Sequence, residues 1–175
     1  SIVGGKGWDE AVVTRLAAEM RAGVHITTNG LDSLAAFQAM GVTSPYLVLP
    51  PWFSDDTVAL GLTYYRDHGV EPAGHMRYDP GRKWRELQPS DLYPLGMGFE
   101  QEIEPLYTQI RNGCPDNADG VFIAGTGFRC VGILDALERD LGRPVLSANQ
   151  VSLWHCLRLS GVRAEIDGYG SLFDF

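Results

Sequence analysis

The residues best placed to do chemistry form a short bend, Gly125-Thr126-Gly127, directly after the apolar run 121–124. An apolar run, a glycine-rich turn and then a helical stripe predict a buried strand whose carboxyl end opens toward a ligand. Glycines let backbone N–H groups approach an anion, and the start of a following helix adds a favourable partial charge. The bend therefore predicts a cradle for a carboxylate or enolate oxygen, although the same pattern is equally typical of a plain tight turn.

The cysteines and histidines do not form a second candidate site. The three cysteines, Cys114, Cys130 and Cys156, are odd in number and far apart, which argues against a disulfide framework and favours a reducing, cytoplasmic compartment. Neither they nor the four histidines have metal-ligand spacing, so we expect no metal site. Cys130 shares an apolar stripe with the leucines of the following helix and is interpreted as a core residue.

Composition excludes several classes of protein. The chain has 175 residues and a net charge of −8, and it shows no basic stripe, so a nucleic-acid partner is not expected. No apolar run reaches the roughly 18 residues that span a bilayer, so no membrane partner is expected either. The one tight basic cluster, Arg82, Lys83 and Arg85, is interpreted as a solvated loop.

Apolar runs and helical stripes alternate along the chain, which predicts an α/β protein with parallel sheets. Strands are predicted at 24–28, 45–49, within 70–77, at 120–124 and at 144–147. Helices are predicted at 9–21, 31–40, 54–68, 99–110, 130–141 and 149–157. We expect Asp9, Ser54 and Asn149 to cap their helices. A long loop is expected at 79–98.

A family resemblance rests on residues 120–162, which read GVFIAGTGFRCVGILDALERDLGRPVLSANQVSLWHCLRLSGV. Leu137-Glu138, the runs GRPV (142–145) and SANQ (147–150), and Trp154-His155 resemble the second-lobe signature of the maleate isomerase and arylmalonate decarboxylase branch of the Asp/Glu racemase superfamily. Upstream segments around 26–28, 41–42 and 47 fit the same branch more loosely. The resemblance covers most of the chain, but only residues 120–162 are specific.

The resemblance implies a fold and an activity. It implies two flavodoxin-like, Rossmann-like lobes that face each other across a cleft, with residues 41–150 as the second lobe and residues 1–40 plus 151–175 as an incomplete first lobe. It implies an isomerase, racemase or decarboxylase that acts on a small dicarboxylate without a cofactor, commonly as a homo-oligomer. In this branch, cysteine thiols at the cleft serve as nucleophile, base or proton donor.

This chain differs from that pattern at the positions of the family cysteines. The position of the second-lobe cysteine is Gly125, and the first-lobe cysteine would fall just before Ser1, so the catalytic residue is unknown. We expect that the chain begins within a longer protein. The expected substrate-binding residues are Ser1, Trp52, Gly125, Thr126 and Gly127, and Trp52 could equally serve packing. A carboxylate-binding homologue without catalysis is the alternative function.

The remaining polar residues receive structural interpretations. His155 is expected to be a hydrogen-bonded interface histidine rather than a base. Asn149, expected to cap its helix, could also face the cleft. Arg77, Asp79 and Arg82 could close over an anion, but surface charge is the simpler expectation. A nucleotide-binding protein is a weaker hypothesis, because no G-x-G-x-x-G follows the first strand and no P-loop is present.

Overall fold

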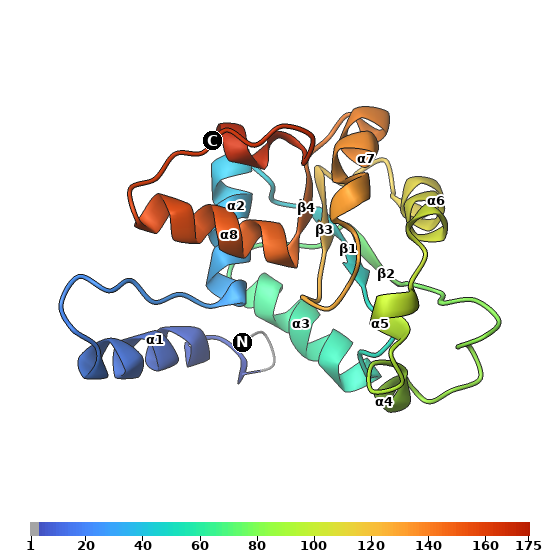
Figure 1. Ribbon diagram of the computed structural model, residues 1–175, viewed down its shortest axis with the longest axis horizontal. Coiled ribbons are helices and arrows are strands. Elements are labelled where there is room, and N and C mark those ends of the chain that lie inside the picture. Colours follow the sequence, from blue (N-terminus) through green and yellow to red (C-terminus); the bar gives the residue numbers. More distant parts are fainter. Residues whose placement is uncertain (1–3) are drawn as a thin grey trace.

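The computed structural model describes residues 4–175 and is built around one four-stranded sheet (Figure 1). The strands are β1 (Pro45–Leu49), β2 (Gly74–Arg77), β3 (Gly120–Ile123) and β4 (Val145–Ser147). Their order is β2-β1-β3-β4, and all three pairings are parallel. The predicted α/β class with a parallel sheet is therefore confirmed.

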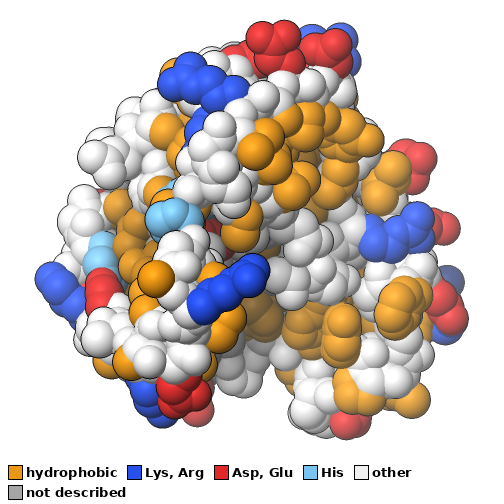
Figure 2. All heavy atoms as spheres, turned by 60° about the vertical axis from the view of Figure 1, so that its left-hand side comes forward, with side chains coloured by type: hydrophobic (Ala, Val, Ile, Leu, Met, Phe, Trp, Pro, Cys, Tyr) orange, Lys and Arg blue, Asp and Glu red, His pale blue; other side chains and the backbone are white. Residues whose placement is uncertain are grey.

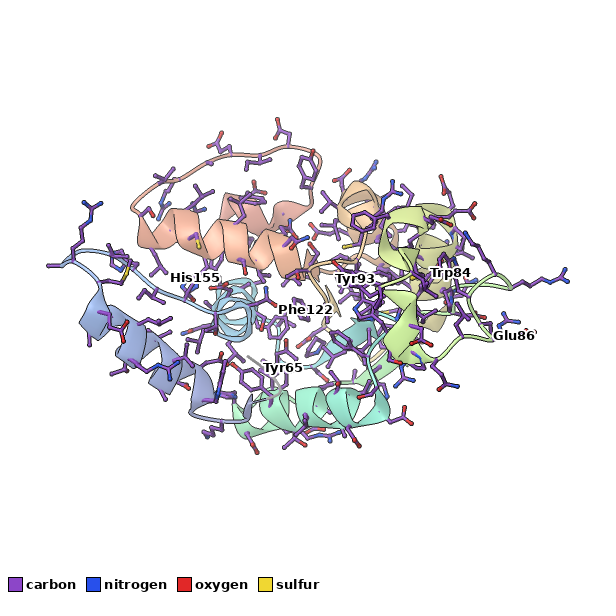
Figure 3. All side chains as sticks on the ribbon, turned by 60° about the horizontal axis from the view of Figure 1, so that its bottom comes forward. Tyr65, Trp84, Glu86, Tyr93, Phe122 and His155 are labelled. Atoms are coloured by element: carbon purple, nitrogen blue, oxygen red, sulfur yellow. The ribbon has the colours of Figure 1, made fainter. Side chains whose placement is uncertain are left out.

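Helices cover both faces of this sheet. One face carries α2 (Asn29–Met40), α3 (Asp55–Asp67) and α8 (Ala148–Leu159), and the other carries α6 (Ile103–Gly113) and α7 (Leu134–Leu141) (Figure 1). Successive side chains of a strand point to opposite faces, so Leu47 and Phe122 join the first core while Val48 and Ile123 join the second. Figure 3 shows Phe122 and Tyr65 turned toward each other between the sheet and α3.

The first helix, α1 (Trp8–Glu19), meets the layered body at its first turn, where Glu10 pairs with His68, and its other end projects away from the body (Figure 1). Asp9 is its one buried residue, while Trp8, Leu16 and Met20 beside it are exposed. Figure 2 turns this side forward and shows apolar side chains among scattered charges, with a hollow near the lower edge. A turn at residues 22–23 follows α1, and residues 24–28 then lead to α2 without a neighbouring strand in the described chain, so the predicted strand at 24–28 was wrong.

Two of the three predicted helix caps were wrong. Ser54 caps α3 by accepting a hydrogen bond from the Thr57 amide, as expected. Gly7 precedes α1, so Asp9 lies inside that helix. Ser147 caps α8 in place of Asn149, since its hydroxyl accepts from the Gln150 amide. The alternative cap was visible in the sequence, because Ser147 and Gln150 have the spacing of a capping box.

The expected loop at 79–98 contains two short helices, α4 (Pro89–Leu92) and α5 (Met97–Glu100), and the next helix begins only at Ile103. Short 3-10 helices lie at Val131–Ile133 and Ser171–Asp174. The division into two lobes stays a prediction; α2 and α8, expected in the other lobe, share one core with α3. Within residues 4–175, no helix combines the length and the apolar character that crossing a membrane requires.

Candidate functional site

The site lies where the carboxyl ends of β1 and β3 meet at one edge of the sheet. These strands are neighbours, yet β1 continues into α3 on one face and β3 leads to α7 on the other. Such a reversal opens a crevice in parallel α/β sheets and is the usual place for a ligand. The residues after β1 and β3, including Trp52 and the bend Gly125–Gly127, are brought together there.

Four of the five predicted site residues line a single cavity. It has a volume of about 440 Å³, and its walls include Trp52, Gly125, Thr126 and Gly127 together with Tyr93. Ser1, the fifth predicted residue, lies outside the described residues. The bend is thus open to a crevice rather than filled by side chains.

Hydrogen bonds fix the bend through its carbonyl groups and leave its donors free. The Phe128 amide donates to the Gly125 carbonyl at 3.1 Å, and Asn149 Nδ2 donates to the Thr126 carbonyl at 3.0 Å. Within residues 4–175, the amides of Gly125, Thr126 and Gly127 and the Thr126 hydroxyl have no acceptor. Such N–H and O–H groups, held in place by a hydrogen-bonded turn, can bind an anionic oxygen.

The helix that supports this bend is not the one expected. Residues 128–130 are irregular and a 3-10 turn follows, so α7 begins only at Leu134 and its first turn does not adjoin the bend. The neighbouring helix start belongs to α8, whose second residue, Asn149, makes the bond to Thr126. The positive end of the α8 dipole thus takes the place predicted for α7.

Gly125 has a backbone that disfavours any side chain. Its φ is +92°, a left-handed conformation that residues with a Cβ rarely adopt. A Cβ built there would lie 2.9 Å from Pro50 Cγ, closer than such contacts occur. The local backbone geometry therefore disfavours a cysteine at this position.

Aromatic side chains wall the bend, and the sequence did not single out two of them. Trp52 packs against Tyr93 and Phe128 with ring centroids 5.1 and 5.6 Å apart. Tyr93, labelled in Figure 3 beside the carboxyl end of the sheet, lies so close to Gly127 that an added Cβ would be 2.4 Å from its ring. Tyr93 was missed because it falls in the segment expected to be an irregular loop.

A neighbouring cavity of about 580 Å³ lies on the other side of Tyr93. Its walls include Thr126, Gly127 and Asn149 from the bend region, and Phe99 and Arg129 beyond it. Arg129 donates to the carbonyls of Phe99 and Gln101, so its guanidinium positions this wall.

Two of the three thiols lie in surroundings that disfavour the reactive thiolate. Cys130 is buried as predicted, and burial raises its pKa to about 12 despite a hydrogen bond with Ser147. Burial also raises the pKa of Cys114, while Cys156 is exposed on α8. A thiolate at neutral pH is therefore not favoured at the first two positions.

His155 is held at an interface, as predicted. Its Nδ1 lies 2.7 Å from Asp32 Oδ1, and Ser152 on the same helix donates to Asp32 Oδ2 at 2.5 Å. This buried carboxylate joins α2 to α8. Figure 3 shows His155 on the lower side of α8 in that view.

Two of the residues that were expected to be surface charges form ion pairs with neighbouring side chains. Arg77 pairs with Asp55, and Asp79 pairs with Arg85. In the part of the chain that the structure describes, no three His, Cys, Asp or Glu side chains are grouped to hold a metal ion.

The chain is similar to known proteins in sequence and in fold. A family model for arylmalonate decarboxylase matches residues 93–173. The arylmalonate decarboxylase of Bordetella bronchiseptica is 38% identical over 160 residues, which make up 91% of this chain and 62% of that protein. The chain thus spans less than two thirds of the length of this relative.

Solved structures extend the comparison to the fold. A crystal structure of arylmalonate decarboxylase has a TM-score of 0.75 at 23% identity, covering 99% of this chain and 69% of that one. The maleate isomerase Iso from Pseudomonas putida S16 has a TM-score of 0.81 at 18% identity, covering 98% and 65%. The predicted resemblance is confirmed: this chain is related to arylmalonate decarboxylase in sequence and fold, and to maleate isomerase in fold.

Proposed function

We propose that this chain supplies the carboxylate-binding side of a cofactor-independent isomerase, racemase or decarboxylase of the Asp/Glu racemase superfamily, acting on a small dicarboxylate in the cytoplasm. One observation carries the proposal: three amides and the Thr126 hydroxyl, beside a cavity at the switch point of the sheet, have no acceptor among the described residues 4–175. These donors would hold one substrate carboxylate and stabilise negative charge that develops on it. The activities of the relatives support the class of reaction.

The proposed roles follow from the positions of the residues. Gly125, Thr126 and Gly127 bind the carboxylate, Trp52 and Tyr93 wall the substrate, and Asn149 positions the bend through the Thr126 carbonyl. The proton-transfer or covalent step needs a thiol that residues 4–175 do not offer at the bend. In the proposed enzyme that thiol comes from the facing lobe, and the working protein is a homo-oligomer.

Binding of maleate and of phenylmalonate, measured by isothermal titration calorimetry, tests the cradle. Thr126→Val keeps the shape of the side chain and removes its hydroxyl, so we expect about tenfold weaker binding of both ligands, because a hydrogen bond to a charged group is lost. Thr14→Val, on the exposed face of α1, is the matched control and should bind like the wild type. Unchanged affinity in Thr126→Val would remove Thr126 from the site.

A non-catalytic carboxylate-binding protein is the second candidate, and the glycine at the family cysteine position favours it. Turnover of maleate or phenylmalonate before and after iodoacetamide separates the two functions. An enzyme with a cleft thiol loses its turnover on alkylation. A binding protein shows calorimetric binding in both samples and turnover in neither.

A further inference from the structure

A separate cavity of about 490 Å³ lies at the carboxyl end of β2, between the segment 78–85 and helices α5 and α6. We call it the loop cavity. Phe128 stands between it and the bend, packing on Tyr78 with ring centroids 5.5 Å apart. Figure 3 shows Trp84 turned inward toward α5 and α6, whereas Glu86 of the same segment lies at the outer edge.

The floor of the loop cavity is apolar and rigid. Tyr78, Trp84 and Met97 line it and are 4%, 8% and 1% exposed. Buried aromatic and thioether side chains of this kind accept the apolar part of a small ligand. The volume is large enough for a single ring or a branched alkyl group.

Most of the polar groups around the cavity are already paired. Arg85 binds Asp79 at 2.5 Å, and Lys83 binds Glu100, so four of the six charges at the rim neutralise one another. Gln109 exchanges two hydrogen bonds with the Asp79 backbone. These contacts brace the segment 78–85 against α5 and α6 and leave few groups for a ligand.

Three polar groups at the cavity remain available to a ligand: the Arg82 guanidinium, the Glu102 carboxylate and the Tyr78 hydroxyl. None has a hydrogen bond or an ion pair within residues 4–175. The Tyr78 hydroxyl is the most informative of the three, because its side chain is almost fully buried and lines the cavity. An unpaired hydroxyl in such a place is costly unless water or a ligand satisfies it.

The unpaired carboxylate of Glu102 favours a positively charged group beside Tyr78. Burial first, and then the nearby carboxylates of Glu102 and Asp79, raise the pKa of Tyr78. An ammonium group beside the hydroxyl and Glu102 would offset this negative potential. Arg82 is left for a carboxylate, which it can bind through two parallel hydrogen bonds.

We propose that the loop cavity binds a small zwitterion, an α-amino acid with an apolar side chain. Its ammonium group lies against Tyr78 and Glu102, its carboxylate against Arg82, and its side chain on Trp84 and Met97. The site is distinct from the dicarboxylate cradle, because a different set of residues lines it and its two unpaired charges, Arg82 and Glu102, have opposite signs.

Calorimetric titration of the full chain with three matched probes tests the ligand class. L-Phenylalanine carries both charges, 3-phenylpropionate lacks the ammonium group, and phenethylamine lacks the carboxylate. We expect phenylalanine to bind at least about tenfold more tightly than either partial probe, since each of them loses one charged contact. Equal affinity for the three probes, or no binding of phenylalanine at millimolar concentration, would overturn the proposal.

Single substitutions then locate the site. Glu102→Gln, Arg82→Gln and Tyr78→Phe should each weaken phenylalanine binding several-fold, whereas Arg15→Gln and Glu19→Gln on the exposed face of α1 should not. Thr126→Val should leave phenylalanine binding unchanged, which separates this site from the cradle. Binding that responds to Thr126→Val but to none of the three cavity substitutions would place the amino acid at the bend and refute the loop cavity site.

Discussion

At the scale of single residues, Gly125 combines a left-handed backbone with a crowded position for any Cβ atom. We expect Gly125→Ala to lower the free energy of unfolding by about 2–4 kcal/mol, from the left-handed backbone and from overlap with Pro50. Urea denaturation followed by circular dichroism measures the change. Gly142→Ala is the matched control, because Gly142 also has a positive φ but no atom near its Cβ, and about 1 kcal/mol is expected there. Equal losses in the two variants would show that Pro50 exerts no constraint.

The cysteines should differ sharply in reactivity. At pH 8 we expect iodoacetamide to label the exposed Cys156 and to leave Cys130 unmodified, because a thiol with a pKa of about 12 is almost entirely protonated. Mass spectrometry of the labelled peptides measures both rates, and labelling in guanidinium chloride provides the fully reactive reference. Comparable rates in the native protein would contradict the burial of Cys130.

At the scale of elements, the aspartate before β3 ties together the starts of two strands. Asp119 accepts hydrogen bonds from the Thr43 amide and hydroxyl, both at 2.7 Å, and from the Ser44 amide at 2.8 Å. Burial alone would raise the pKa of Asp119, but these hydrogen bonds outweigh it and lower the pKa. The ionised carboxylate therefore stabilises the fold above its unfolded pKa of about 3.9, and that contribution disappears as pH falls through the lower folded value.

Asp119→Asn tests this tie. At pH 7 we expect it to reduce the free energy of unfolding by about 1–3 kcal/mol, because an amide accepts these bonds less strongly than a carboxylate. The difference from the wild type should begin to shrink as pH falls below about 4 and should vanish only below the lower folded pKa of Asp119, where the native carboxylate is itself protonated. Asp116→Asn, an exposed neighbour, should show neither effect. A difference that persists unchanged at pH 2 would rule out the charged hydrogen bonds as its source.

The sequence was a good guide to elements with strong periodicity and a poor one to elements set by tertiary contact. The strands at 45–49 and 120–123 are continuous apolar runs buried on both faces, and such runs are recognisable without a structure. The segment 24–28 has a strand-like composition but no neighbouring strand in the described chain. Short helices such as α4 and α5 depend on packing against Gly127 and Phe128, which no local pattern reveals.

The site was predictable to a similar extent. The glycines and the threonine that follow a buried strand identified the bend. The family resemblance strengthened the prediction that this bend binds a ligand. The contribution of Tyr93 was hidden, because its contact with Gly127 joins positions far apart in the chain. Asn149 was noticed but given the wrong role, since Ser147 competes for the same cap and leaves the amide free to bind Thr126.

At the scale of the whole molecule, charge and exposed apolar surface act in opposite directions on self-association. The net charge of −8 repels identical chains, while Trp8, Leu16 and Met20 on α1 favour contact. We expect light scattering at physiological salt to give at least twice the mass of 19.2 kDa, and salt to strengthen the association by screening the repulsion. A mass of 19.2 kDa at every protein and salt concentration would contradict the proposed homo-oligomer.

The contact between Pro50 and Gly125 has a consequence for protein engineering. Installing a thiol at position 125 by one codon change would force a proline ring and a sulfur-bearing side chain into the same volume. A route that first exchanges Pro50 for a smaller residue, and only then introduces cysteine, avoids an intermediate in which the two side chains overlap and leaves only the positive φ to oppose the new side chain. The order of the two changes would then set the stability of the intermediate from which new catalysis is selected.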